Sequence, residues 1–183
     1  LAEQQAALVL TDMGDDARAD ALFESLLREA ERPDSPCPRC EILTDYSASR
    51  LLRWEETPPE PEAAAAVQQK LAEIIARPTF EGCQRPNEVA FREQLRAGAA
   101  LFRGDGDEAG RALGAAQAAF PSERQTPSRR LDWLDLAARQ ARFAGDLSAA
   151  QHHADAEARE ARAAAQVPAQ HRAALQLAQI ALA

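Results

Sequence analysis

The chain has 183 residues, of which 46% are apolar but only 5% aromatic, and its formal net charge is −8. Alanine accounts for 43 residues and favours helices over strands, so this composition excludes a β protein. The acidic balance argues against a nucleic-acid-binding protein, which needs a basic excess to displace counterions from phosphates. No run of 18 apolar residues occurs, so we expect no membrane span.

Apolar residues return at helical spacing along the whole chain, and glycine and proline divide this pattern into nine predicted helices. Proline-rich connectors separate successive pairs, so we expect antiparallel helix hairpins. In chain order, the predicted helices cover about 1–13, 16–31, 41–55, 60–76, 87–103, 106–119, 129–143, 147–166 and 169–183.

A Gly-Asp turn recurs at Gly14, Gly104 and Gly145, followed by alanine five residues later and an apolar residue nine residues later. The last two turns lie 41 residues apart, and the first two are separated by about two such periods. This glycine is expected to adopt the left-handed conformation that ends one helix, while aspartate caps the next. The alanine then marks the close approach of two antiparallel helices.

This pattern resembles the tetratricopeptide repeat family, and the third unit matches best through Gly104, Ala109, Leu113 and Pro121. The period here exceeds the family's length of about 34 residues. The resemblance implies an all-α fold, a right-handed superhelix of antiparallel helix hairpins (a TPR-like α-solenoid), with a generic α-hairpin solenoid as the alternative. We expect one array over 1–183, an excerpt of a longer chain, with units at about 1–36, 37–82, 83–127 and 128–167 and a final helix at 168–183.

In that family the first helix of each pair lines a concave face, so the resemblance implies a non-catalytic scaffold that binds a peptide or helix of a partner protein. Two pairs of arginines three residues apart each share a helical face and are suited to carboxylates, which suggests an acidic partner. The alternative is that these arginines are solvated or pair with nearby carboxylates. The predicted partner-binding residues are Tyr46, Arg50, Arg53, Trp54, Gln94, Asp135, Arg139 and Arg142.

Two tryptophans stand out in a chain so poor in aromatic residues. Trp133 has leucine neighbours and is expected to pack in the core, whereas Trp54 lies between charged residues near a helix end and is a candidate binding anchor.

Three interpretations of Cys37, Cys40 and Cys83 stay open: unpaired thiols, a disulfide among the three, or a zinc site that lacks a fourth ligand. Cys40 and Cys83 are 43 residues apart, one period, so both are expected at the same edge of neighbouring repeats. A thioredoxin-like role is excluded because no βαβ pattern surrounds the cysteines.

We find no catalytic motif, and we predict neither enzymatic activity, a bound metal nor a cofactor. His152 and His153 point about 100° apart on one helix, and their acidic neighbours at helical spacing form only a weak metal motif. One alternative function is a regulatory or sensor module attached to an enzymatic or transcription-regulator domain outside this chain. A second is a cell-envelope assembly lipoprotein. We place a cytoplasmic location slightly ahead of the periplasm or cell envelope, and we expect self-association through the apolar C-terminal helix.

Overall fold

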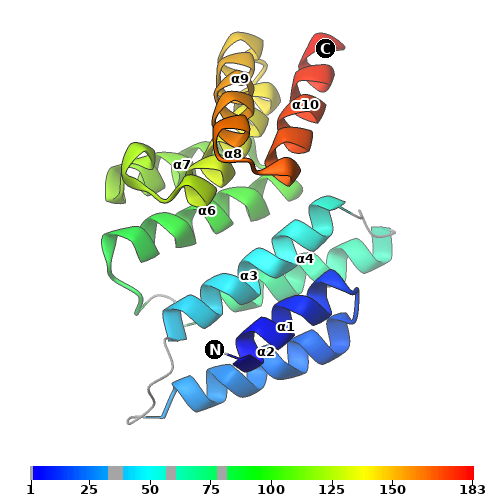
Figure 1. Ribbon diagram of the computed structural model, residues 1–183, viewed down its shortest axis with the longest axis vertical. Helices are drawn as coiled ribbons and strands as arrows, with labels where there is room; N and C mark the ends of the chain where they lie inside the picture. The colour runs from blue at the N-terminus through cyan, green and yellow to red at the C-terminus, as the bar shows by residue number, and fades with distance from the viewer. Residues whose placement is uncertain (1, 33–38, 57–60, 78–81) are drawn as a thin grey trace. The chain divides into compact units, whose positions relative to one another are not determined.

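The computed structural model describes residues 2–32, 39–56, 61–77 and 82–183, with the side chains of all of these except residues 12, 50–56 and 61–67. Over these residues the protein is all-helical, with nine α-helices and one short 3-10 helix (Figure 1). None of the described helices combines the length and apolar character that crossing a bilayer requires. The elements are α1 (Ala2–Asp12), α2 (Asp16–Ala30), α3 (Arg39–Glu56), α4 (Pro61–Ile75), α6 (Pro86–Phe102), α7 (Gly106–Ala119), η1 (Ser122–Arg124), α8 (Pro127–Phe143), α9 (Leu147–Ala163) and α10 (Val167–Ala181).

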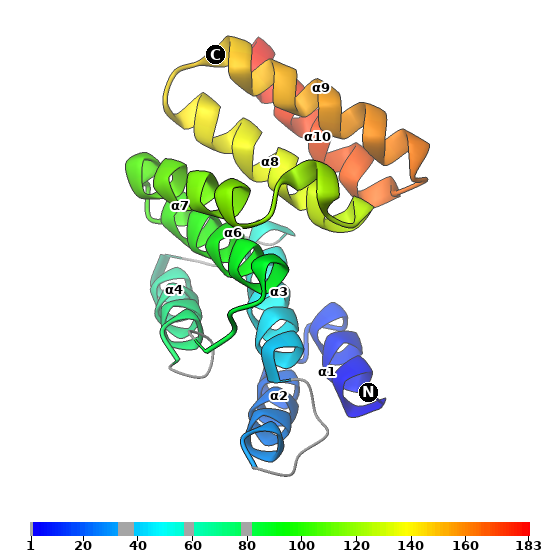
Figure 2. The same cartoon turned by 90° about the vertical axis from the view of Figure 1, so that its left-hand side faces the viewer.

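Contacts between Cα atoms divide the chain into an N-terminal part, Leu1–Gln84, and a C-terminal part, Arg85–Ala183. Within each part, every helix contacts the next one along the chain. The first helices of successive pairs also meet, since α1 contacts α3, α6 contacts α8, and α8 contacts α10. Figure 2 shows α8, α9 and α10 as three neighbouring rods. The expected sequential helix pairs are therefore confirmed, while one continuous array stays a prediction.

The Gly-Asp turns have the predicted geometry. Gly14, Gly104 and Gly145 have φ angles of 79°, 74° and 79°, in the left-handed region that favours glycine. The aspartate after each glycine accepts a hydrogen bond from the backbone N–H three residues later, and thus caps the following helix. The alanines expected at close helix approaches, Ala19, Ala109 and Ala150, are fully buried.

Two glycine substitutions are expected to change stability in opposite directions. An added Cβ meets nothing within 4 Å at Gly114, inside α7, or at Gly145. Gly114→Ala should therefore stabilise the protein by about 1 kcal/mol, because alanine is the better helix former. Gly145→Ala should destabilise it by about 1–2 kcal/mol, because its φ is positive. Urea denaturation of both variants measures this, and a shift of the same sign in both would contradict it.

The N-terminal part has an aromatic core and two further links between its helices. The rings of Phe23 on α2 and Tyr46 on α3 stack with centroids 4.7 Å apart. Glu24 on α2 accepts hydrogen bonds from Lys70 on α4 and from Arg77 just beyond it. Burial acts to raise the pKa of Glu24, but these two cations outweigh it and the pKa is lowered.

A disulfide joins Cys40, in the first turn of α3, to Cys83, beyond α4, with Cα atoms 5.8 Å apart. It closes a segment that contains both helices of the second hairpin. The disulfide interpretation of the cysteines is thereby confirmed for this pair.

The C-terminal part is packed mainly by small residues. Alanines and leucines of α6, α7 and α8 form one buried cluster, on which the half-buried Trp133 packs. A second cluster joins Leu131 on α8, Ala161 on α9 and Ala169 on α10. Small side chains let the helices approach closely, so polar groups on α8, α9 and α10 come within hydrogen-bonding distance of one another.

Candidate functional site

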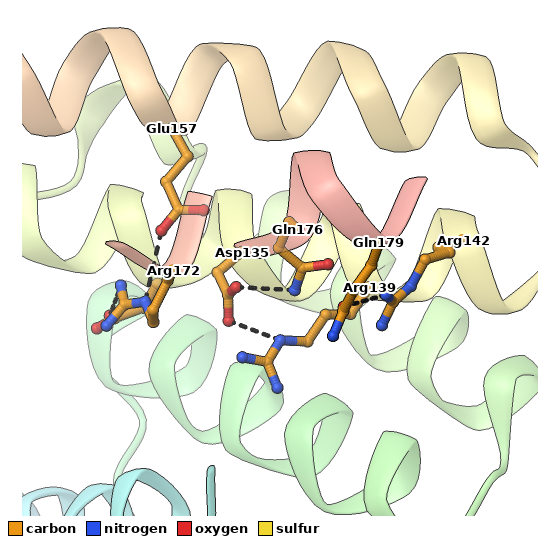
Figure 3. A network of polar contacts seen from close by, with 8 residues as sticks. Asp135, Arg139, Arg142, Glu157, Arg172, Gln176 and Gln179 are labelled. Carbon is orange, nitrogen blue, oxygen red and sulfur yellow. Dashed lines mark hydrogen bonds and ion pairs between the residues drawn. The ribbon is translucent and has the colours of Figure 1, made fainter. Parts of the chain in front are cut away.

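The charge of the chain is unevenly distributed. The N-terminal part carries 17 acidic and 8 basic residues, whereas the C-terminal part carries 12 acidic and 13 basic residues. The overall acidity therefore belongs to the N-terminal part, and the C-terminal part is close to neutral. In the C-terminal part, several arginines gather with buried acids and amides on α8, α9 and α10, in the network drawn in Figure 3.

Asp135 on α8 is the centre of one half of this network. Its side chain is only 5% exposed, and Oδ2 lies 2.9 Å from Nε of Arg139, one turn further along the same helix. Its other oxygen accepts a hydrogen bond of 3.1 Å from the Gln176 amide on α10. Asp135 thus binds a neighbouring helix and also orients the Arg139 side chain, which is 24% exposed.

Glu157 on α9 is the centre of the other half. Its side chain is fully buried, with Oε1 3.4 Å from Nε of Arg172, and Figure 3 shows it pointing from α9 toward that arginine. Arg172 on α10 also donates to Asp132 on α8 at 3.3 Å. Burial first, and then the charge of Asp135, raise the pKa of Glu157 to about 8, although Arg172 lowers it. Glu157 is therefore mainly protonated at neutral pH.

Arg142 lies at the end of the network nearest the C-terminus of α8. It is half-buried and donates a hydrogen bond to the neutral Gln179 amide on α10. Among the described side chains, no carboxylate lies within ion-pair distance of Arg142. Burial lowers the pKa of Arg142, and the positive charge of Arg139 lowers it further, whereas Asp135 raises it.

Polar side chains at one repeated position link the first helices of the pairs. Gln176 and Asp135 lie 41 residues apart, and so do Gln4 and Asp45, which are joined by a hydrogen bond of 2.7 Å between α1 and α3. Gln94 on α6 lies a further 41 residues before Asp135. Both parts of the chain thus join neighbouring first helices by a glutamine–aspartate hydrogen bond of the same spacing.

Three of the predicted partner-binding residues lie inside the helix packing. Tyr46 is fully buried against Phe23, and Gln94 donates to Gln125 in the connector before α8. Asp135 is buried in the network described above. The resemblance to the repeat family placed these three side chains among the partner-binding residues of the concave face, whereas the structure buries each of them against a residue of its own part. Their role in binding a partner stays a prediction.

The other predicted residues divide into two groups. Arg139 pairs with Asp135, as the alternative interpretation of the arginines proposed, and the half-buried Arg142 lies three residues further along α8. Arg50, Arg53 and Trp54 belong to α3, but their side chains lie outside the described residues. Among the predicted residues whose side chains are described, the structure therefore brings together Asp135, Arg139 and Arg142.

Trp133 and the histidines form a separate contact. Trp133 packs on the core cluster, as expected, and the His153 ring meets it edge-on with centroids 5.6 Å apart. Burial, and then the neighbouring His152, lower the pKa of His153. His153 therefore contacts Trp133 while Glu157 contacts Arg172, so the helical His-Glu spacing does not join these two side chains in a metal site.

The disulfide also decides what Cys40 and Cys83 offer chemically. Both sulfur atoms are bonded to each other, so neither is a thiolate ligand, and the zinc interpretation is wrong for this pair. Cys37 lies outside the described residues.

Sequence reasoning missed Arg172, Gln176 and Gln179, and considered Glu157 only as an acidic neighbour of His153 in a weak metal motif. Their signal was present in part, because Gln176 follows Asp135 by the repeat spacing. Glu157 gave no comparable signal, since one acid among many on a helix resembles a solvated residue. A scan against protein-family models, a search of curated proteins and a search of solved structures each give no match.

Proposed function

We propose that the protein is a non-catalytic helical scaffold that holds a peptide or helix of a partner protein against the side-by-side first helices of its pairs. The observation that carries this proposal is the direct contact of α6 with α8 and of α8 with α10. First helices in successive contact form a surface of the kind that helical-repeat proteins use for extended partners.

The repeat spacing supports an α-solenoid of TPR-like hairpins as the architecture of this scaffold. Gln94, Asp135 and Gln176 occupy successive first helices at intervals of 41 residues. Equal spacing of first-helix residues is what an array of similarly placed hairpins requires, although Gln176 bonds to Asp135 whereas Gln94 bonds to Gln125. A regular array of this kind binds through a surface that extends across repeats rather than through one enclosed cavity.

The disulfide favours a second, more specific version of this function, a scaffold of the cell envelope. Structural disulfides persist in oxidising compartments and are rare in the cytosol. Cys83 is buried, so its bond to Cys40 is shielded from reductants. An exported protein with a peptide-binding surface fits an assembly role. Exposed Leu175 on α10 and Leu182 just beyond its end fit the expected self-association, which stays a prediction.

Peptide selection tests the scaffold function. Short random peptides displayed on phage are selected on the immobilised full chain, and the binders are titrated by calorimetry. We expect saturable binding with one peptide per chain. Ala173→Asp, which puts a charge at a fully buried position of α10, should abolish binding, because it displaces α10 from α8.

Ala174→Asp is the matched control, since Ala174 is the exposed next residue on the same helix. It should bind like the wild type. A selection that yields no binder, or binders that Ala173→Asp does not affect, would overturn the proposed surface.

A further inference from the structure

Most half-buried arginines of the C-terminal part pair with an acidic side chain, Arg129 lies over the ring of Phe91, and Arg142 is bound by a neutral amide. Arg92 and Arg96 pair with Glu93, Arg130 with Glu160, and Arg172 with two acids. Arg142, by contrast, is bound by the neutral Gln179, with no carboxylate at ion-pair distance among the described side chains.

The surroundings of Arg142 favour an added anion. Arg139 lies one turn earlier on the same face of α8, so two positive charges lie close together in a half-buried place. The lowered pKa of Arg142 has the same origin, since burial and Arg139 both oppose its charge. A negative group there would compensate a charge that water only partly solvates.

The network also holds this place rigidly. Asp135 fixes Nε of Arg139, and Gln176 fixes Asp135 from α10. Gln179, one helical turn beyond Gln176, holds Arg142 from the same helix. Figure 3 shows Gln179 in contact with Arg142, while the Arg139 guanidinium next to them points toward Asp135. Donors that are already oriented bind a planar anion with little loss of side-chain entropy.

We propose that Arg142, with Arg139 and Gln179 beside it, is the subsite that binds a carboxylate of an acidic side chain in the partner segment. The planar guanidinium matches a carboxylate by two parallel hydrogen bonds. A protein carboxylate fits better than a nucleic-acid phosphate, because the C-terminal part, with 12 acidic and 13 basic residues, lacks the basic excess that binding of a nucleic-acid backbone requires. This inference rests on the proposed scaffold function and assigns the chemistry of its partner.

The test measures binding of a fluorescein-labelled oligoglutamate peptide to the full chain by anisotropy at low salt, with oligoglutamine as the uncharged probe. We expect oligoglutamate alone to bind, and Arg142→Gln to weaken it about tenfold, the value of a charge-assisted hydrogen bond. Arg142→Lys should lose part of this affinity, because lysine keeps the positive charge but lacks the planar guanidinium that makes two parallel hydrogen bonds. Circular dichroism confirms that both variants fold.

Arg159→Gln is the matched control, because Arg159 is exposed on α9 and the change in net charge is the same. It should alter binding less than twofold. If Arg142→Gln and Arg159→Gln weakened oligoglutamate binding equally, the loss would come from the change in net charge alone. That result would overturn the subsite. Preferential binding of an oligothymidine through Arg142 would overturn the choice of a carboxylate.

The peptides selected on the chain separate failure of the subsite from failure of the scaffold. If selected peptides bind one per chain but Arg142→Gln leaves them unaffected, the scaffold stands and the subsite is wrong. If neither selected peptides nor oligoglutamate bind, both proposals are overturned. Acidic selected peptides that lose about tenfold affinity with Arg142→Gln support both.

Discussion

Reduction of the Cys40–Cys83 disulfide is expected to lower the stability of the N-terminal part by about 4 kcal/mol. The bond joins residues 43 positions apart, and cross-linking a loop of that length removes much of the conformational entropy of the unfolded chain. The value of about 4 kcal/mol is the free energy that the loss of loop entropy predicts for a separation of 43 residues. Native-state hydrogen exchange, with and without a phosphine reductant, assigns the loss to helices α1 to α4.

Replacing the bonded cysteines measures the contribution of the disulfide to stability without a reductant. Cys40→Ser and Cys83→Ser should each reproduce the loss, whereas Cys37→Ser retains both bonded cysteines and should not. Exchange rates in the C-terminal part should stay unchanged, because the bond lies within the N-terminal part. Titration of three thiols in the native protein would contradict the disulfide itself.

Glu157→Gln is expected to remove a pH dependence of stability worth about 5 kcal/mol between pH 4.5 and 8. In the folded protein the buried Glu157 has a pKa of about 8, against an ordinary value of 4.5. Between these values the folded state holds a proton that the unfolded state has released. Wild-type stability therefore falls as the pH rises through this window, and glutamine, which does not titrate, avoids that fall.

Urea denaturation of the wild type and Glu157→Gln at intervals from pH 4 to 9 measures this difference. The two stability curves should run parallel below pH 4.5, diverge up to about pH 8, and run parallel again above it. Asp135→Asn provides a check on the cause, since its charge raises the pKa of Glu157 and its loss should narrow the window. Parallel curves over the whole range would contradict a protonated Glu157.

The helices and their turns could be predicted because the signals for them are local. The left-handed glycines and aspartate caps at Gly14, Gly104 and Gly145 depend only on the residues that adjoin them, and the structure has them as expected. The ends of the helices agree within three residues. The α9 helix ends at Ala163 rather than at 166, whereas α3 begins at Arg39 rather than at 41 and α8 at Pro127 rather than at 129. Such end turns depend on weak final hydrogen bonds.

The side chains between helices could not be predicted in the same way. A polar residue on a first helix was assigned to the concave binding face, yet Gln94 and Asp135 are buried because partners on other segments satisfy them. The sequence lists many glutamines and acids but does not say which two will meet. The burial of Glu157 was missed for this reason, since only the packing of α9 against α8 and α10 buries it.

The cysteines combine a feature that the sequence predicts, their position, with one that it does not, their bonding. Their spacing of one period predicts that Cys40 and Cys83 lie at the same edge of neighbouring hairpins. Bonded, unbonded and metal-bound cysteines share that spacing, so the distance between the two residues was needed to choose. The Cα atoms lie 5.8 Å apart, within the range of a disulfide.

The most direct measurement of the scaffold and its subsite is an NMR titration of the isotope-labelled full chain with a selected peptide, observed at arginine Nε–Hε groups and backbone amides. The account predicts shifts that saturate at one peptide per chain and concentrate on Arg139, Arg142 and Gln179, along α8 and α10. Shifts confined to the helices on the other side of the pairs, α7 and α9, or no shifts at saturating peptide, would contradict it.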